Sequence, residues 1–279
     1  MEYIALHIAC QDEALSEILT AELAEWPFES FETVGSELVA YIQAAELAAC
    51  RAEADAMLGR YGVAGRYEPI ANQNWNAVWE RDFEPVEVEG RLLIRAPFHA
   101  PAPAGVLEVV LTPRNSFGTG HHATTWMMAR EVLDLPVAGR CGLDLGSGTG
   151  VLAIVAAKCG AAHVDAVDID DWCEASCRAN AAANGVADRV EPILGDVGRV
   201  EGRSYDFILA NINRNILLRG LECYARLLKR GGTLLMSGFY EADAPLLVAA
   251  AERYGLRHTA TRSREEWRLL RLEKPADRD

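Results

Sequence analysis

The stretch CGLDLGSGTG, Cys141–Gly150, decides the fold of this 279-residue chain. Its apolar first half, Cys141–Leu145, predicts a strand, and three alternating glycines follow. The apolar, alanine-rich segment Val151–Cys159 then predicts a helix. Glycines allow a sharp turn and a close approach of a ligand to the backbone. The N-terminus of the following helix presents unpaired N–H groups, so this strand–turn–helix unit predicts a ligand-binding loop.

The spacing of the glycines narrows the class of ligand. A dinucleotide loop reads G-x-G-x-x-G, whereas this chain has Val151 at the place of the third glycine. The Gly-Lys-Ser/Thr ending of a P-loop is absent. The pattern Asp-x-Gly-x-Gly-x-Gly instead resembles the S-adenosylmethionine loop of class I methyltransferases. That resemblance places Asp144 near the methionine moiety and the backbone of Gly146 and Gly148 against the cofactor. An ordinary strand–helix turn is the alternative.

Acidic residues follow the next two expected strands. The strand 164–168 ends in Asp168, which lies 22 positions beyond Gly146, near the spacing of about 20 expected for a ribose-binding carboxylate. The strand 189–194 is followed by Asp196. An Asp at this place in methyltransferases often binds the adenine amino group, and a solvated turn is the equal alternative here.

The fourth expected strand, 205–210, leads into Asn211-Ile212-Asn213-Arg214-Asn215. Ligands of open α/β sheets lie beyond the carboxyl ends of the strands, which places Asn211 beside the glycine loop. One of the three asparagines caps the expected helix 216–229, and Asn211 is the least suited because it lies furthest from that helix.

The remaining pattern completes a seven-stranded α/β sheet, which resembles that of class I methyltransferases (Rossmann-like). Gly231-Gly232 is expected to form a turn before the strand 233–237. A helix is expected over 241–254, and two antiparallel strands over 256–261 and 267–272 close the sheet.

The N-terminal region predicts a separate small domain. Its order of elements, β-α-β-β-α-β, is typical of a ferredoxin-like α+β module. We expect this domain over 1–70, a linker and hairpin over 71–104, and the catalytic domain over 105–279. Trp75 and Trp79 in the linker are expected to pack between the domains as a hinge. The small domain shows no catalytic motif and is interpreted as a binding or oligomerisation domain.

A second motif, Asn115–Thr125 (NSFGTGHHATT), precedes the expected helix 126–133. Its small and hydroxyl-bearing residues suit a lid over a polar ligand, and a loop with a threonine cap is the alternative. The adjacent histidines His121 and His122 suggest a metal site, but no carboxylate or cysteine neighbours them, so no metal is expected.

Composition limits partners and compartment. The formal net charge is −14, from 27 basic and 41 acidic residues, which argues against nucleic acid as the main partner. The seven cysteines have no regular spacing and are interpreted as reduced thiols of a cytoplasmic protein. No signal peptide is seen, and no apolar stretch reaches the ~18 residues that would span a membrane. The sequence assigns no oligomeric state.

Together these motifs resemble the ribosomal protein L-eleven methyltransferase family. The small N-terminal domain, Trp-x3-Trp, Phe-Gly-Thr-Gly-x-His-x-Thr-Thr, Asp-x-Gly-x-Gly-x-Gly and Ala-Asn-Ile follow in the family order. The resemblance spans nearly the whole chain, and the segment Phe117–Thr125 is its most specific part. By position, the cofactor contacts of the family fall on Thr125, Gly146, Asp168 and Asn211.

Two positions depart from the family pattern. Ala123 stands where the family usually has proline, and Asn213-Arg214 stands where it often has Leu-Ala. The second departure affects the side of the pocket that receives the target amine.

The resemblance implies methyl transfer from S-adenosylmethionine to lysine or N-terminal amines of a basic ribosomal large-subunit protein. Asn211 would orient the amine, and His122 is a candidate for proton removal, with loop packing as its alternative. The acidic charge fits a basic substrate held by the N-terminal domain. Three other functions stay open: a methyltransferase of another protein or a small molecule, a sensor that binds the cofactor without turnover, and a nicotinamide oxidoreductase, which the glycine spacing disfavours.

Overall fold

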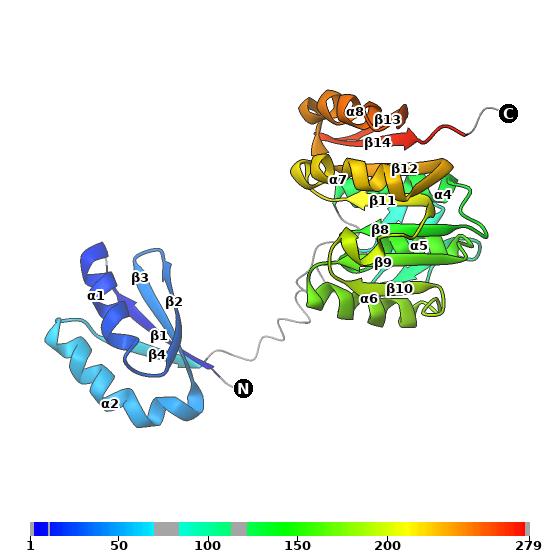
Figure 1. Ribbon diagram of the computed structural model, residues 1–279. Coiled ribbons are helices and arrows are strands. Elements are labelled where there is room, and N and C mark those ends of the chain that lie inside the picture. The colour runs from blue at the N-terminus through cyan, green and yellow to red at the C-terminus, as the bar shows by residue number, and fades with distance from the viewer. Residues whose placement is uncertain (1–2, 11, 70–83, 113–121, 277–279) are drawn as a thin grey trace. The chain divides into compact units, whose positions relative to one another are not determined.

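The computed structural model describes residues 3–10, 12–69, 84–112 and 122–276. The chain divides into two compact units, Met1–Phe83 and Glu84–Asp279, which are described in turn (Figure 1). The expected hinge tryptophans, Trp75 and Trp79, lie outside the described residues, as does the part of the second motif before His122.

The first unit is a four-stranded antiparallel sheet with two helices. Its elements in chain order are β1 (Tyr3–Ala9), α1 (Glu13–Leu23), β2 (Phe28–Val34), β3 (Glu37–Gln43), α2 (Ala44–Arg60) and β4 (Gly65–Pro69). The strand order β2-β3-β1-β4, with every neighbour antiparallel, confirms the predicted ferredoxin-like arrangement.

Buried side chains alternate along the strands of this sheet, so that one face of the sheet packs against the helices. Leu6 and Ile8 of β1 are fully buried, and they belong to one core with Leu19 and Leu23 of α1 and Met57 of α2. Because side chains on a strand point to alternate faces, the intervening residues point to the face that α1 and α2 leave uncovered.

The second unit is built on a seven-stranded sheet with the order β10-β9-β8-β11-β12-β14-β13. Its strands are β8 (Cys141–Leu145), β9 (His163–Asp168), β10 (Val190–Leu194), β11 (Tyr205–Asn211), β12 (Leu228–Tyr240), β13 (Arg257–Arg264) and β14 (Trp267–Glu273). Pairing is parallel except where β14 runs antiparallel to both β12 and β13. This sheet confirms the predicted class I methyltransferase fold.

Helices cover both faces of this sheet and create two cores. The helices are α4 (Ala123–Asp134), α5 (Val151–Lys158), α6 (Asp171–Ala183), α7 (Arg214–Leu227) and α8 (Ala244–Glu252), with short 3₁₀ helices η1 (Val197–Val200) and η2 (Glu241–Asp243). Apolar residues of α4, α5 and α6 form one core, and those of α7 and α8 form the other. The strands feed both: Leu209 faces the first core and Ile208 the second.

A three-stranded sheet joins the first of these cores. Its strands are β5 (Val86–Val88), β6 (Leu92–Arg95) and β7 (Leu107–Val110). Strands β5 and β6 form the predicted hairpin around Gly90. Val88, Leu92 and Val109 are fully buried in the core that contains α4 and α5. The hairpin is thus part of the second compact unit.

Two local predictions were wrong. Helix α4 begins at Ala123, three residues earlier than expected, because the side chain of His122 caps it. Gly231 and Gly232 lie within β12 rather than in a turn before it. The register between β11 and β12 shifts there, and Gly231 N–H donates to the Lys274 carbonyl 2.8 Å away, so the glycines form an irregular part of the strand.

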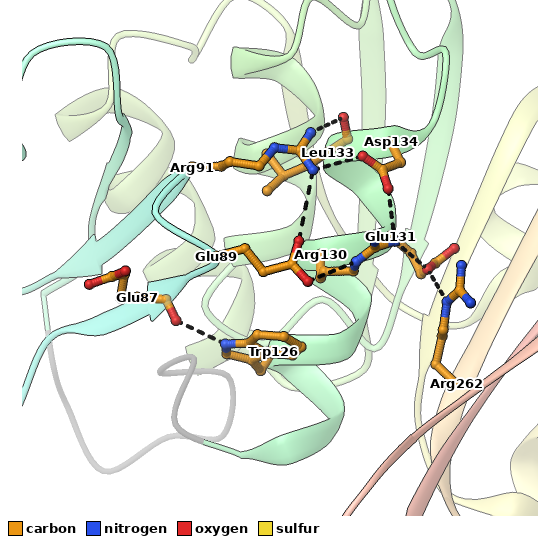
Figure 2. Close-up of polar contacts among 9 residues, drawn as sticks. All are labelled: Glu87, Glu89, Arg91, Trp126, Arg130, Glu131, Leu133, Asp134 and Arg262. Atoms are coloured by element: carbon orange, nitrogen blue, oxygen red, sulfur yellow. Dashed lines mark hydrogen bonds and ion pairs between the residues drawn. The ribbon is translucent and has the colours of Figure 1, made fainter.

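An ion-pair network fixes α4 between the hairpin and β13 (Figure 2). Arg91 donates to Asp134 Oδ1 over 2.8 Å, and this bond lowers the pKa of Asp134. Arg130 contacts Glu89 at 3.3 Å. Figure 2 also shows Glu131 facing Arg262, whose Nε lies 2.8 Å from the carboxylate.

Glu131 is the buried member of this network. Its side chain is 2% exposed, whereas that of Arg262 is 49% exposed. Its Oε1 also accepts a 3.0 Å hydrogen bond from Arg130. A buried carboxylate costs free energy unless it is paired, so the network depends on its two arginine partners.

We expect Arg262→Ala to lower the free energy of unfolding by about 1–2 kcal/mol, because it leaves the buried carboxylate of Glu131 with one partner. In a Glu131→Gln background the same change is expected to cost less than about 0.5 kcal/mol. Urea unfolding of the four proteins of this cycle measures the coupling. Arg257→Ala, which removes an exposed partner of Glu273, is the matched control and should be nearly neutral. Equal effects of Arg262→Ala in both backgrounds would contradict the assignment.

Candidate active site

Four strand ends meet at one edge of the large sheet. Strands β8, β9, β10 and β11 run parallel, and the chain order reverses between β8 and β11. This topological switch point is where open α/β sheets bind ligands. Asn211 ends β11, and Ile212 directly after it lies against the glycine loop, since a Cβ on Gly146 would stand 2.3 Å from Ile212 Cγ2. The structure thus brings Asn211 beside the loop, as the sequence predicts.

The glycine loop uses the left-handed backbone conformations that only glycine adopts readily. The φ angles of Gly146, Gly148 and Gly150 are 66°, 53° and 78°. Helix α5 begins directly afterwards at Val151, so its N-terminal N–H groups lie at the loop. Space and backbone conformation both therefore require glycine at position 146.

The side chain of Asp168 holds the glycine loop by accepting a hydrogen bond from the backbone of the loop. Its Oδ2 accepts a 2.8 Å hydrogen bond from Gly148 N–H, and its Oδ1 accepts one of 3.1 Å from Asp170 N–H. Asp170 caps α6 through its own side chain, as expected. The acid expected to bind ribose thus lies at the loop, at the end of β9.

Asp144 is almost completely buried under the loop, with 1% of its surface exposed. Its Oδ2 accepts a 3.1 Å hydrogen bond from Ala153 N–H in the first turn of α5. Gly150, at the N-cap position, has no side chain for this purpose, so Asp144 supplies the missing acceptor. Burial raises the pKa of Asp144 to about 7.

Asp196 follows β10 and caps η1, accepting a 2.9 Å hydrogen bond from Gly198 N–H. The carboxylate is therefore engaged in a local turn, which was the alternative to adenine binding. Its role toward adenine stays a prediction.

Asn211 and Thr125 meet across the site although they lie 86 positions apart. Asn211 Nδ2 donates to Thr125 Oγ1 over 3.2 Å. Among the described residues, the buried Oδ1 of Asn211 has no hydrogen-bond partner, and the same is true of Ser147 Oγ in the glycine loop. Buried polar atoms are nearly always bonded, so these two orphaned atoms fit a site that receives a polar ligand. Ser147 was not predicted, because a serine inside a glycine loop gives no separate signal.

His122 occupies the N-cap of α4. Its Nδ1 lies 2.7 Å from Thr124 Oγ1, and the ring meets the Trp267 ring at a centroid distance of 4.6 Å. Trp267 in turn lies 4.4 Å from the half-exposed ring of Tyr240. This aromatic row, His122–Trp267–Tyr240, was missed from the sequence, because its members come from three distant segments.

Apolar side chains stand exposed beside Asp168. Ile169 is 78% exposed, and Leu194, which pairs with Asp168 in the sheet, is 46% exposed. Exposed aliphatic groups at a strand edge suit the flat face of a purine. In the sequence, the only sign of these two residues is their position: Ile169 follows an expected strand and Leu194 ends one.

One group of possible metal ligands occurs among the described residues, and it lies at the opposite ends of the strands. It consists of His163, Asp165 and Glu191. Arg203 Nη1 lies 2.8 Å from Asp165 and 3.7 Å from Glu191, so the guanidinium group of Arg203 already supplies positive charge to the cluster. We interpret the cluster as an ion-pair network.

The sheet order, the glycine loop and the polar atoms at the switch point define a class I methyltransferase that uses S-adenosylmethionine. The family model described as "Ribosomal protein L11 methyltransferase (PrmA)" matches residues 3–275. The chain belongs to the ribosomal protein L11 methyltransferase family. In Porphyromonas gingivalis, a ribosomal protein L11 methyltransferase is 43% identical over 93% of this chain and 91% of the relative.

Two further relatives agree. The ribosomal protein L11 methyltransferase of Chlorobaculum parvum is 35% identical over 92% of this chain and 91% of the relative. The crystal structure of a ribosomal protein L11 methylase from Lactobacillus delbrueckii subsp. bulgaricus superposes with a TM-score of 0.62 and 25% identity, over 69% of this chain and 98% of that structure.

Two general properties complete the description. Within the described ranges, no helix is both long and apolar enough to cross a membrane. All seven cysteines lie in the described part of the chain and all are free thiols.

The buried carboxyl group of Asp144 predicts a pH dependence. Its folded-state pKa of about 7 lies above the usual carboxyl value of about 3.9, so between these pH values only the folded state keeps the proton. This contribution to stability is therefore lost as pH rises. We expect it to fall by about 2–3 kcal/mol between about pH 5 and pH 8 in the free protein.

The Asp144→Asn variant has no ionisable group at this position. Its free energy of unfolding relative to that of wild type should therefore rise by about 2–3 kcal/mol between about pH 5 and pH 8. Urea unfolding at several pH values, without cofactor, measures the difference between the two proteins. A difference that does not change with pH would contradict the prediction.

Proposed function

We propose that this protein transfers methyl groups from S-adenosylmethionine to amine nitrogens of ribosomal protein L11. The observation that carries the proposal is the buried Oδ1 of Asn211 beside the glycine loop, for which the described part of the chain provides no hydrogen-bond partner. Family membership supports the identity of the substrate, since the relatives bear that name. A ribosomal substrate also favours the cytoplasm as the compartment.

The proposed cofactor contacts come from the glycine loop, from α4 and from the ends of β9 and β10. The backbone of Gly146 and Gly148 would pack against the cofactor, Asp168 would bind the ribose, and Thr125 would contact the methionine side. The exposed Ile169 and Leu194 supply apolar surface for the adenine. Bound there, S-adenosylmethionine supplies an electrophilic methyl group on a cationic sulfonium. The carboxyl group of Asp144 lies beneath the loop, where a positive charge would favour its ionised form.

The target amine must be neutral to attack. A lysine with pKa near 10.4 is neutral in only about one part in 10³ at pH 7, so deprotonation costs roughly 4–5 kcal/mol. An N-terminal amine of pKa near 8 costs about 1 kcal/mol. A neighbouring sulfonium and a dry pocket both lower the pKa of the amine, so a strong protein base is not required.

Asn211 suits the role of aiming the amine. The hydrogen bond from its Nδ2 to Thr125 Oγ1 fixes the plane of the amide. The oxygen then remains available to accept an N–H of the amine and to direct the nitrogen lone pair at the methyl carbon. The lone pair forms the new N–C bond while the S–C bond electrons go to sulfur.

The aromatic row adds a second support for an amine. Asn211 pairs with Ser237 across the sheet, and Tyr240 lies three residues further along the same strand. Aromatic faces attract alkylammonium groups. His122 belongs to this row, and its Nδ1 is engaged by Thr124, which favours positioning of α4 over proton removal.

The first unit carries most of the charge that would attract a basic protein. Residues 1–83 contain 15 acidic residues and four arginines, and so account for −11 of the net charge of −14. Opposite charge raises encounter rates and suppresses wrong partners. The N-terminal domain is therefore the proposed recognition domain.

The sheet face that α1 and α2 leave uncovered carries part of this charge. Glu29, Glu32, Glu37 and Glu68 lie on it, with Glu29 accepting a 2.6 Å hydrogen bond from Tyr3 Oη. Held carboxylates on a flat face suit lysine and arginine side chains of a partner.

The reaction is tested by intact mass of unmethylated L11 protein after incubation with this protein and S-adenosylmethionine. Steps of one methyl mass are expected. Asn211→Ala should lower kcat by about 10²-fold, because the amine loses its orientation. Asn215→Ala, an exposed asparagine four residues on, is the control and should keep full activity.

Other outcomes point to the alternatives. Unchanged turnover and unchanged cofactor affinity in Asn211→Ala would overturn the assignment of this residue. Cofactor binding without any mass change of L11 would favour another substrate. Binding without consumption in the presence of a cell extract would favour the sensor.

The acidic face predicts a salt-dependent effect on substrate affinity. The double change Glu29→Gln with Glu32→Gln should raise KM for L11 about three- to tenfold at low salt, because each neutralised carboxylate removes an attraction. The increase should shrink at high salt. Glu222→Gln with Glu252→Gln removes two exposed charges from the second unit and is the matched control. The same KM for both variants would contradict the proposed surface.

A further inference from the structure

Two asparagines four residues apart, Asn180 in α6 and Asn184 at its C-cap, contact β7 and the residues directly after it. The side chain of Asn184 accepts a 2.9 Å hydrogen bond from Val110 N–H and donates one of 2.6 Å to the Val110 carbonyl. The amide therefore bonds both backbone groups of one residue, as a neighbouring strand would. It also donates to the Asn180 carbonyl within α6. These contacts bind β7 to α6 and do not include the glycine loop.

Asn180 makes a different pair of contacts and is only 1% exposed. Its Nδ2 donates a 3.0 Å hydrogen bond to the carbonyl of Thr149, inside the glycine loop. Its Oδ1 accepts a 3.1 Å hydrogen bond from Thr112 N–H, just beyond the end of β7. One buried amide of α6 thus joins the glycine loop, 31 positions away along the chain, to the segment after β7, 68 positions away.

The remaining peptides of the loop are held from β9. Gly146 N–H and Ser147 N–H both donate to the Val167 carbonyl, over 2.9 and 3.2 Å. Gly148 N–H donates to Asp168. The peptide between Thr149 and Gly150 comes last: its N–H donates to the Ser147 carbonyl over 2.8 Å, and its carbonyl accepts the hydrogen bond from Asn180 of α6. Gly150 is the N-cap of α5, with φ at 78°, so a rotation of this peptide would alter both the loop and the start of the helix.

We propose that Asn180 is a positioning residue for cofactor binding. Its amide fixes the orientation of the Thr149–Gly150 peptide and ties the glycine loop to the end of β7. The loop backbone is then ordered before the cofactor binds. The cost of ordering the loop therefore does not reduce the free energy of cofactor binding. The proposal rests on the proposed function through the cofactor alone and requires no particular methyl acceptor.

The position of Asn184 makes the test specific. Both side chains stabilise the contact of α6 with β7, so loss of either should lower the temperature of unfolding. Only Asn180 also contacts the glycine loop. A residue that serves only to hold the fold would affect stability without a selective effect on the cofactor.

The experiment compares Asn180→Ala and Asn184→Ala with wild type. Calorimetric titration with S-adenosylhomocysteine is performed well below each unfolding temperature, which is measured without ligand. We expect the Kd to rise about tenfold in Asn180→Ala, as for loss of one hydrogen bond to a buried carbonyl, and less than about twofold in Asn184→Ala. In steady-state assays, KM for S-adenosylmethionine should rise in Asn180→Ala while kcat changes little.

Asn180→Asp provides a second variant of nearly the same volume, should the alanine variant not fold. Its carboxylate keeps the acceptor for Thr112 N–H and loses the donor to the Thr149 carbonyl. It should weaken S-adenosylhomocysteine binding as Asn180→Ala does. An unchanged Kd in a folded Asn180 variant, or an equal loss in Asn184→Ala, would overturn the proposal.

Failure of the proposed function gives a different result. A wild-type protein that binds S-adenosylhomocysteine but transfers no methyl group to L11 would contradict the proposed substrate. The effect of Asn180 on the Kd would still be measured in that case.

Discussion

The close approach of the glycine loop to the end of β11 is the constraint on which the site depends. A side chain at Gly146 would collide with Ile212, and the backbone there is left-handed. The loop can therefore pass between β9 and β11 only with glycine at this point. Its N–H groups then reach the Val167 carbonyl and Asp168. The positions of Asp144 below the loop and Asn211 beside it follow from this path.

Buried carboxyl groups have different hydrogen-bond partners inside and outside the site. Asp165 and Glu131 are both 2% exposed in their side chains, and each has an arginine partner within 3.0 Å. Asp144 is equally buried, yet within the described residues its recorded partner is a backbone N–H group. The same edge of the sheet contains the side-chain oxygens of Asn211 and Ser147, which have no hydrogen-bond partner within the ranges that the structure describes. Within the described residues, these two acids outside the site thus have charged partners, whereas the buried polar groups at the site, where a cationic ligand would bind, do not.

The composition of the two units fits the proposed division of substrate recognition and chemistry between them. The first unit has the larger excess of acidic residues and an uncovered sheet face. The second unit is nearly balanced in charge and holds the glycine loop, Asn211 and the aromatic row. Attraction of a basic protein acts over about a Debye length, whereas methyl transfer needs contact geometry. Attraction and chemistry act over different distances, so separate units can provide them.

The sequence alone determined the order of the strands along the chain, the glycine loop and the acids that follow β9 and β10, because periodicity and glycine conformations are local properties. It also placed Asn211 at the switch point through the rule for parallel strands. Tertiary structure decided that His122 caps α4, that Tyr240 and Trp267 lie beside it, and that Asn180 bridges β7 and the loop. These features join residues up to 145 positions apart. Local patterns carry no signal for such pairs, because packing of the complete sheet and its helices decides which side chains meet.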